Sequence, residues 1–315
     1  MRAVIPVWPE FVRTDQVERD DALAVVGFGD APAGACVTIA ARQLGSVPLA
    51  EVWRSALPIE KSRIGDVSFA ANGAVLIGAI RAAAGETDVI TARLYEQIVD
   101  AVRSAGYPHL LRAWNHVGSI NESEGDLERY QRFSKGRHEA LTRCGYQCQQ
   151  FPAASAVGMS DQGLAVYFIA SRVPGMQVEN PRQVAAYDYP PVHGPRSPSF
   201  ARATVAQWNG NAMIFVSGTS SVVGHETRHH GKVEAQLDET LENMRVIVAE
   251  AAARIGRKAS LDDLTVAKTY LRRAADYETI APRLTAQLAR TQHLFVESDI
   301  CRRDLLLEIE GVARI

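Results

Sequence analysis

Short apolar runs recur in two parts of the chain, and each run follows a turn signal. Asn72-Gly73 precedes an apolar stretch over residues 74–80, and Asn209-Gly210 precedes another over residues 212–216. Asn-Gly pairs favour the positive backbone φ angles that tight turns require. We therefore predict a short buried strand after each turn.

A helix with one apolar face is predicted after each of these strands. The apolar positions are Leu94, Ile98, Ala101 and Val102 in the first half, and Leu237, Leu241, Met244 and Val248 in the second. Residues at these spacings share one face of an α-helix. Gly106 and Gly256 stand where the two helices are expected to end.

The rest of each half repeats the same order. Strands are predicted over residues 110–117, 153–159 and 164–170 in the first half and over 264–271, 294–300 and 305–312 in the second, with second helices over 126–142 and 276–289. The order β–α–β–α–β–β occurs twice, which indicates an α+β fold built by internal duplication of a two-layer unit. Because helices cover one face of each sheet, we expect the two bare faces to pack together and leave a ligand cleft at their boundary.

A proline-rich stretch separates the halves. Residues 180–198 hold five prolines, which exclude regular secondary structure and indicate an ordered linker. The predicted domains are therefore residues 1–180 with an irregular N-terminal extension, a linker over 181–199, and a second domain over 200–315.

Composition limits the function classes. The 315 residues include 34 Lys and Arg and 36 Asp and Glu, a net charge of −2, so we expect neither nucleic acid nor an anionic membrane as a partner. No apolar run approaches the ~20 residues of a membrane span. Four cysteines are too few for a disulfide scaffold, which favours a reducing cytoplasm.

The string His225-Glu226-Thr227-Arg228-His229 matches the H-E-x-x-H pattern of zinc proteases. That chemistry requires both histidines on one face of a helix. Gly224 and Gly231 bracket the string and leave too little room for such a helix. We expect a polar loop and no metal site.

Ser217 to Ser221 form a strand-end turn that lacks the second glycine of a serine-hydrolase elbow, because Val222 stands in its place. Exposed backbone N–H groups and hydroxyls at such a turn suit a carboxylate. Gly218, Thr219 and Ser220 are the candidate contacts.

Tyr130 and Arg137 are seven residues apart on a predicted helix, on one face and about 10 Å apart along its axis. An arginine there suits bidentate binding of a carboxylate. The alternative is a solvated arginine.

The last predicted strand alternates. Leu305, Leu307 and Ile309 would face the helices, and Glu308 and Glu310 would face the cleft. A carboxyl in a partly dry cleft has a raised pKa, which suits a general acid. The alternative is a glutamate that faces solvent.

Several strings together resemble the chorismatases, enzymes that hydrolyse chorismate. These strings lie at residues 113–117, 121–122, 127–133, 179–183, 194–203, 217–227 and 301–308. The second half alone also resembles the Rid/YjgF group, which has a chorismate-mutase-like fold. The resemblance therefore implies two Rid-like units, with the active site in the cleft at their interface.

The resemblance also implies an activity: a cofactor-free enzyme that releases the enolpyruvyl side chain of chorismate as pyruvate. Glu308 then corresponds to the acid and Cys301 to the residue that selects 3-hydroxybenzoate as product. The implied binding residues are Tyr130, Arg137, Tyr189, Arg202, Gly218, Thr219 and Ser220. Ser220 departs from the small Ala or Gly of the family, which leaves the share of 4-hydroxybenzoate or of the dihydroxy-cyclohexadiene carboxylate open.

Three other functions compete with this one: a Rid-like imine or enamine hydrolase, a zinc peptidase through His225 and His229, and a binding module without catalysis. A small molecule is the expected partner in each case but the peptidase. Duplication within one chain suits a monomer, and a small homo-oligomer is the alternative.

Overall fold

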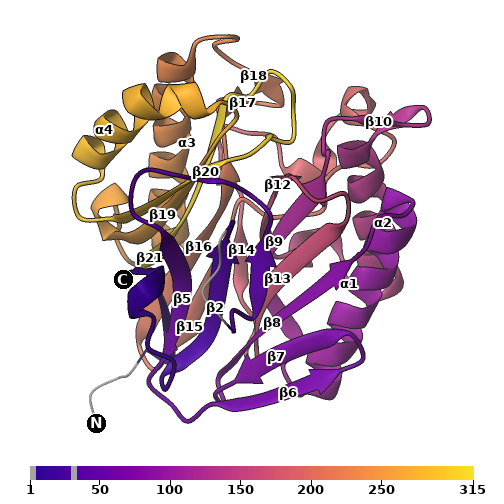
Figure 1. Ribbon diagram of the computed structural model, residues 1–315, viewed down its shortest axis with the longest axis vertical. Helices are drawn as coiled ribbons and strands as arrows, with labels where there is room; N and C mark the ends of the chain where they lie inside the picture. Colours follow the sequence, from indigo (N-terminus) through magenta and orange to yellow (C-terminus); the bar gives the residue numbers. More distant parts are fainter. Residues whose placement is uncertain (1–4, 30–33) are drawn as a thin grey trace.

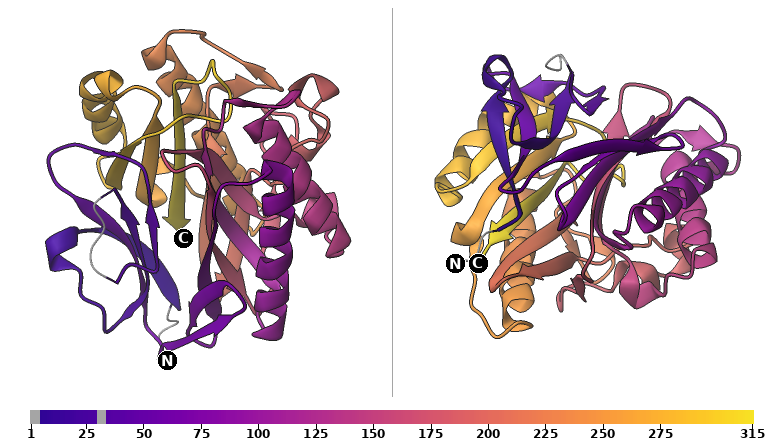
Figure 2. Two further views of the ribbon diagram at one scale, coloured as in Figure 1. Left: turned by 45° about the vertical axis from the view of Figure 1, so that its right-hand side comes forward. Right: turned by 90° about the horizontal axis from the view of Figure 1, so that it is seen from below.

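The computed structural model describes residues 5–29 and 34–315. Three sheets surround a shared interior, and helices cover the outer faces of the two larger sheets (Figure 1). Figure 2 shows α1 and α2 on one side of the molecule and α3 and α4 on the other, with the sheets between them. No helix in the described ranges is long and apolar enough to cross a membrane.

The first unit is a six-stranded sheet in the order β12-β9-β13-β8-β7-β6, covered by two helices. Its elements are β6 (Glu60–Ile64), β7 (Val67–Ala71), β8 (Val75–Ala82), α1 (Thr87–Ser104), β9 (His109–Gly118), α2 (Arg129–Arg143), β12 (Ala153–Met159) and β13 (Leu164–Ser171). Strands β9 and β12 are parallel, and the other pairs are antiparallel. A short hairpin, β10 (Ser123–Glu124) and β11 (Leu127–Glu128), precedes α2.

The second unit is a seven-stranded sheet in the order β14-β15-β16-β21-β19-β20-β4. Its elements are β4 (Gln43–Leu44), β14 (Met176–Val178), β15 (Ala203–Trp208), β16 (Asn211–Thr219), α3 (Val233–Ala253), β19 (Leu264–Leu271), α4 (Tyr277–Gln287), β20 (Gln292–Glu297) and β21 (Leu307–Arg314). A hairpin of β17 (Val222–Val223) and β18 (Glu226–Thr227) extends beyond the sheet.

The predicted duplication is confirmed. The order β8-α1-β9-α2-β12-β13 in the first unit matches β16-α3-β19-α4-β20-β21 in the second. The turn before β16 has φ of 49° at Asn209 and 84° at Gly210, the positive values that a two-residue hairpin turn uses. Strand β15, on the other arm of this hairpin, was not predicted.

The N-terminal extension is not irregular, contrary to the prediction. Strands β1 (Val7–Arg13), β2 (Ala22–Phe28), β3 (Val37–Ile39) and β5 (Leu49–Ser55) form a four-stranded sheet in the order β1-β5-β2-β3. Every residue of β2 is buried, so the strand shows no alternation of apolar and polar positions. Strand β6 is an exposed polar edge strand that carries no apolar signal either.

The segment after residue 180 contains two single-turn 3₁₀ helices, Ala186–Asp188 and Pro191–His193. Strands β4 and β14 come before residue 180 in the chain but pair with the second sheet, at β20 and β15. The division at residues 180 and 199 stays a prediction.

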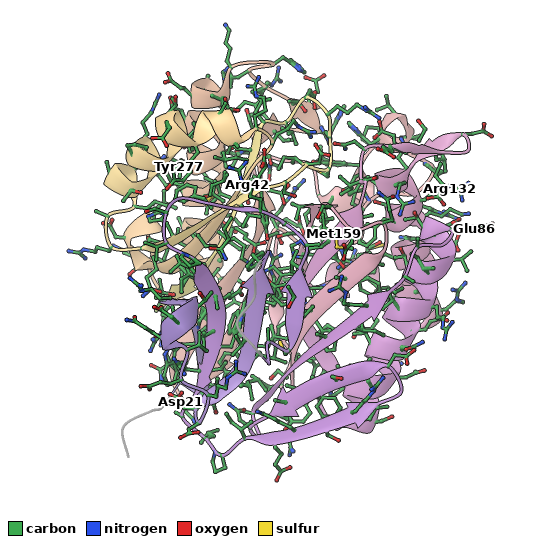
Figure 3. All side chains as sticks on the ribbon, viewed as in Figure 1. Asp21, Arg42, Glu86, Arg132, Met159 and Tyr277 are labelled. Carbon is green, nitrogen blue, oxygen red and sulfur yellow. The ribbon has the colours of Figure 1, made fainter. Side chains whose placement is uncertain are left out.

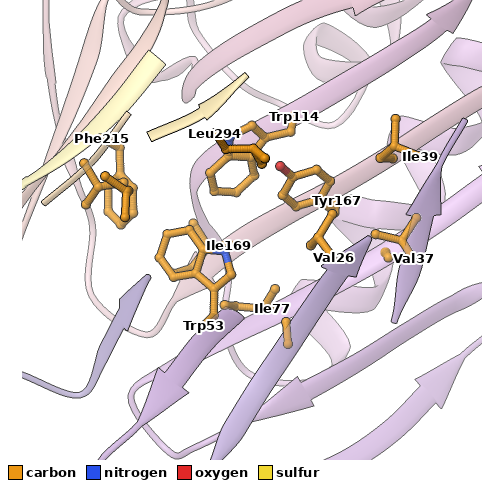
Figure 4. Packing of buried hydrophobic residues seen from close by; sticks show 14 of the residues in the cluster. Val26, Val37, Ile39, Trp53, Ile77, Trp114, Tyr167, Ile169, Phe215 and Leu294 are labelled. Atoms are coloured by element: carbon orange, nitrogen blue, oxygen red, sulfur yellow. The ribbon is translucent and has the colours of Figure 1, made fainter. Parts of the chain in front are cut away.

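The inner faces of the three sheets share one apolar cluster (Figure 4). Trp53 comes from the N-terminal sheet, Trp114 and Tyr167 from the first unit, and Phe215 from the second. The Trp114 and Tyr167 rings stack with their centroids 4.5 Å apart. Two further clusters lie under the helices, one in each unit.

Four charged side chains lie inside this shared interior. Glu51 comes from β5, Arg112 from β9, and Lys268 and Glu310 from β19 and β21, and each is at most 4% exposed. Many other charged residues, such as Asp21, Arg42 and Glu86, lie on the outside (Figure 3).

The four buried charges form one network that ties the three sheets together. Lys268 Nζ lies 2.6 Å from Glu51 Oε2 and 2.9 Å from Glu310 Oε1. Arg112 Nη2 lies 2.6 Å from Glu310 Oε2. Burial opposes ionisation of Glu310, but Lys268 and Arg112 overcome it and lower the pKa of Glu310 to about 2.

Loss of one partner would leave an uncompensated charge in the interior. We expect Lys268→Met to lower the free energy of unfolding by roughly 3–5 kcal/mol, because Glu51 and Glu310 would then lack their shared cation. The control is Arg283→Met, which removes an exposed cation from α4 and is expected to cost about 1 kcal/mol or less. Urea denaturation measures the free energy of unfolding of both variants. Equal losses in the two variants would contradict a stabilising role of the buried network.

Candidate active site

A cavity of about 320 Å³ opens between the two units, at the boundary where the sequence predicts a cleft. Side chains from α2, β12, β16, β21, the 181–199 segment and the loop before β21 line it. We call it the inter-unit cavity. Of the predicted site residues, it is lined by Tyr130, Arg137, Tyr189, Arg202, Gly218, Ser220, Cys301 and Glu308.

Glu308 lies on β21 with its side chain in the inter-unit cavity. Leu307 and Ile309 pack under the helices, so the alternation of the strand turns Glu308 and Glu310 the other way. Leu305 is an exception to the predicted pattern: it precedes β21 and joins the cluster between the sheets. Glu308 is buried at 4% exposure, which excludes a solvent-facing glutamate.

The Glu308 carboxyl is set up to hold a proton. Burial, followed by the negative charge of Glu310, raises the pKa of Glu308 from 4.5 to about 8. Arg112, Ser220 and Arg202 oppose this shift but do not cancel it. At neutral pH the cavity therefore contains a neutral carboxylic acid.

Gly218 leaves the space that the Glu308 carboxyl occupies, because glycine has no side chain. A Cβ at residue 218 would lie 1.9 Å from Glu308 Oε1 and 3.1 Å from Ser155 Oγ. Any side chain at residue 218 would therefore displace the Glu308 carboxyl.

Residues 217–219 lie in strand β16 and not in the predicted turn. Thr219, which ends the strand, and Ser220 after it differ in their relation to the cavity. Ser220 lines the cavity, and its hydroxyl donates to the Leu307 carbonyl at 2.9 Å. The buried Thr219 hydroxyl donates to the Ser217 carbonyl at 2.8 Å, and Thr219 does not line the cavity.

Arg137 reaches the cavity from α2, on the helix face that also carries Tyr130. It is 2% exposed, so the alternative of a solvated arginine is wrong. Its guanidinium lies 5.0 Å from the Tyr95 ring centre, and Nε and Nη2 have no hydrogen-bond partner among the described residues. Burial lowers the pKa of Arg137, and two unpaired donors suit a carboxylate ligand.

Arg202 is the second buried guanidinium. Its Nη2 donates to Tyr189 Oη at 2.7 Å and to the Val184 carbonyl at 3.0 Å. The guanidinium lies 5.1 Å from the Phe200 ring and 5.5 Å from the Tyr189 ring. Nε has no partner in the described part of the chain, so Arg202 keeps a donor for a ligand.

Ser155, His193 and Arg302 are among the cavity residues that the sequence analysis did not single out. Arg302 lies 5.2 Å from the Tyr189 ring and donates to the His225 carbonyl at 2.9 Å. His193 Nε2 lies 3.1 Å from His225 Nδ1, and burial together with Arg302 lowers the pKa of His193 to about 4. Arg302 lies in a loop and His193 ends a single-turn 3₁₀ helix, and neither segment has a periodicity that points to a shared site.

Cys301 lies beside the acid, in the loop between β20 and β21. Burial, followed by Glu308, raises the pKa of Cys301 to about 12. A neutral thiol is a poor nucleophile. Cys301 therefore lines the cavity as a neutral side chain.

The H-E-x-x-H string does not lie on a helix. It runs through the β17–β18 hairpin and the loop that follows. His225 contacts His193, whereas His229 Nε2 lies 3.2 Å from Glu239 Oε2 on α3. The two histidines have different partners, and the helical geometry of a zinc protease is not formed here.

The cavity thus combines one neutral acid with the guanidinium groups of Arg137, Arg202 and Arg302. Such a site is suited to bind a ligand with two anionic groups and to deliver a proton to it.

Residues 51–170 match the family model described as "Chorismatase FkbO/Hyg5-like, N-terminal". A protein of Streptomyces hygroscopicus named chorismatase is 39% identical over 272 residues, which cover 83% of this chain and 78% of the relative. A 3-hydroxybenzoate synthase of the same species is 36% identical over 276 residues, with 84% and 81% covered. A chorismatase crystal structure matches with a TM-score of 0.88 at 33% identity and covers 98% of both chains.

Glu308→Gln is expected to stabilise the protein increasingly between pH 4.5 and 8. In that range folded Glu308 keeps a proton that the unfolded chain releases, so the wild type loses stability as pH rises. Glutamine has no proton to release. The gain should be small near pH 4.5 and reach the order of a few kcal/mol at pH 8. Urea denaturation across this range measures it, and a difference independent of pH would refute a raised pKa.

Proposed function

Because the chain belongs to the chorismatase family, which consists of enzymes, we propose that it converts chorismate to 3-hydroxybenzoate and pyruvate. One observation carries the proposal: Glu308 is a buried, neutral carboxylic acid inside a cavity lined by guanidinium groups. Cleavage of an enol ether needs a proton on its terminal methylene carbon, and a neutral carboxylic acid supplies it.

The cavity matches the charge and size of this substrate. Chorismate carries two carboxylates, and Arg137 and Arg202 offer buried, unpaired donors for them. A volume of about 320 Å³ is at the lower end of small-molecule sites. Tyr130 and Tyr189 provide aromatic walls and phenol groups beside the acid.

The first step moves the Glu308 proton to the terminal methylene carbon of the enolpyruvyl group. The carbon that bears the ether oxygen becomes an oxocarbenium-like centre. The substrate hydroxyl at ring carbon 4 then gives its proton to the Glu308 carboxylate, and its oxygen attacks ring carbon 3. The bond between carbon 3 and the ether oxygen breaks, and pyruvate leaves with that oxygen as its keto group.

The ring product of this step is a 3,4-epoxide. Its bond between carbon 4 and oxygen opens, carbon 3 loses its proton, and the oxygen on carbon 3 is protonated. The ring becomes aromatic as 3-hydroxybenzoate. The sum of the products equals chorismate, so the route consumes no water and needs no redox cofactor.

Cys301 and Ser220 are the residues we assign to product choice. Glu308 raises the pKa of the Cys301 thiol, and Arg302 lowers it. The volume of the Cys301 side chain would exclude a water from the attack. If water attacked instead, the product would be the dihydroxy-cyclohexadiene carboxylate. The relative named 3-hydroxybenzoate synthase supports the aromatic product.

The purified protein is expected to release pyruvate and 3-hydroxybenzoate from chorismate in equal amounts. Chromatography of the aromatic products and an enzymatic pyruvate assay measure both. The diene diol as main product would reject the internal attack. 4-Hydroxybenzoate as main product would reject the assigned opening of the epoxide between carbon 4 and oxygen, because opening at carbon 3 leaves the oxygen on carbon 4. Chorismate left intact, with faster decay of an amino-acid-derived imine, would favour the Rid-like hydrolase instead.

Glu308→Gln is expected to reduce turnover of chorismate by about 10²–10⁴-fold, because an amide cannot deliver the proton. Binding of the product should persist, since Arg137 and Arg202 remain. Steady-state kinetics and calorimetric titration with 3-hydroxybenzoate separate these two effects. The control is Glu60→Gln on the exposed edge strand β6, which should keep wild-type turnover.

A further inference from the structure

The interior network reaches the active site through one strand. We propose that Glu310 is a positioning residue: it fixes Arg112 and the Ser155 hydroxyl so that Glu308 stays in its proton-bearing form. The inference rests on the proposed function, in which Glu308 is the acid. It assigns a catalytic purpose to a cluster that otherwise only joins the sheets.

Glu310 and Glu308 are two residues apart on β21 and face the same way, but their surroundings differ. Glu310 Oε2 accepts from Arg112 Nη2 at 2.6 Å, and Glu310 Oε1 accepts from Lys268 Nζ at 2.9 Å and Tyr270 Oη at 3.2 Å. Glu308 forms no ion pair among the described residues. Arg112 and Lys268 therefore both pair with Glu310, and neither forms an ion pair with Glu308.

Ser155 connects the network to the cavity. Its hydroxyl donates to Glu310 Oε2 and accepts from Arg112 Nη2. Ser155 also lines the inter-unit cavity, and a Cβ at residue 218 would lie 3.1 Å from its Oγ and 1.9 Å from Glu308 Oε1. Because the hydroxyl hydrogen is committed to Glu310 and one lone pair accepts from Arg112, the second oxygen lone pair is what Ser155 can offer to a group in the cavity. A lone pair stabilises the protonated form of a neighbouring carboxyl and repels the ionised form.

Arg112 is the cation that favours the ionised form of Glu308 and so opposes its role as an acid. It is 1% exposed, and its charge already favours ionisation of Glu308. Its Nη1 has no hydrogen-bond partner in the described ranges. With Glu310 neutral, Arg112 would have Glu308 as the carboxyl to compensate its charge.

The other groups around Glu308 do not take over this role. Those whose charge couples to Glu308 are Tyr130 on α2, Arg202 before β15, Tyr270 on β19 and Cys301 in the loop before β21. Burial raises the pKa values of the two tyrosines and of Cys301, so they are neutral at pH 7. Arg202 favours ionisation. Of the described groups that couple to Glu308, Glu310 is the anion.

The experiment is a titration of Glu308 in the intact protein. Glutamate labelled with ¹³C at the carboxyl carbon gives a signal for Glu308, which is assigned by its absence in Glu308→Gln. We expect Glu310→Gln to lower the midpoint of this titration by about one pH unit or more. The alkaline limb of kcat/KM for chorismate should move down by the same amount.

Two further variants separate this role from a structural one. Ser155→Ala removes the lone pair without adding charge or volume, and it should also lower the midpoint. Ser155→Ala provides the test if Glu310→Gln does not fold. Lys268→Met removes a cation from the same network and should raise the midpoint or leave it unchanged, although it destabilises the fold.

A midpoint that stays at the wild-type value in Ser155→Ala and in folded Glu310→Gln would overturn the proposal. The proposal would also be overturned if the Glu308 midpoint moved in the same direction in Glu310→Gln and in Lys268→Met. The titration requires no substrate, so it tests the role of Glu310 even if the wild-type protein releases no pyruvate. A wild-type protein that releases no pyruvate would reject the proposed function, but it would not reject the role of Glu310.

Discussion

Two carboxyl groups on one strand experience opposite electrostatic environments, and the organisation of the molecule depends on this difference. Lys268 and Arg112 hold Glu310 ionised, whereas burial and the charge of Glu310 keep Glu308 protonated. Pairs of titratable groups whose pKa values are pushed apart are a common basis of acid–base chemistry. Here the same four charges also join three sheets, so the stability of the interior and the state of the acid have one physical source.

Much of the fold could be predicted from periodicity. The helices α1 to α4 and the strands around them follow apolar stripes and alternating positions, and β21 showed that Glu308 faces away from the helices. The N-terminal sheet escaped prediction because β2 is buried along its whole length and has no polar face. Glu51 was missed for a different reason. A single glutamate in β5 does not indicate its buried partner Lys268, because that residue lies on a distant strand of another sheet.

The candidate site was predictable in part. Glu308 and Arg137 lie on regular elements, where spacing determines which face a residue occupies. His193 ends a single-turn 3₁₀ helix, and Arg302 lies in a loop far away in the chain. The two residues meet around Tyr189 and His225. Thr219 was named with its neighbours because residues 217–221 were predicted to form a turn, which offers no periodicity. In the structure Thr219 ends β16, is buried and does not line the cavity.

The placement of β21 has a consequence for how the molecule is assembled during synthesis. This strand ends at Arg314, yet it lies in the middle of its sheet, between β16 and β19. A nascent chain can form the first unit early, but Arg112 and Lys268 lack their common counter-ion until Glu310 has left the ribosome. The second sheet therefore closes only after β21 has been synthesised, and until then the facing edges of β16 and β19 lack their hydrogen-bond partners.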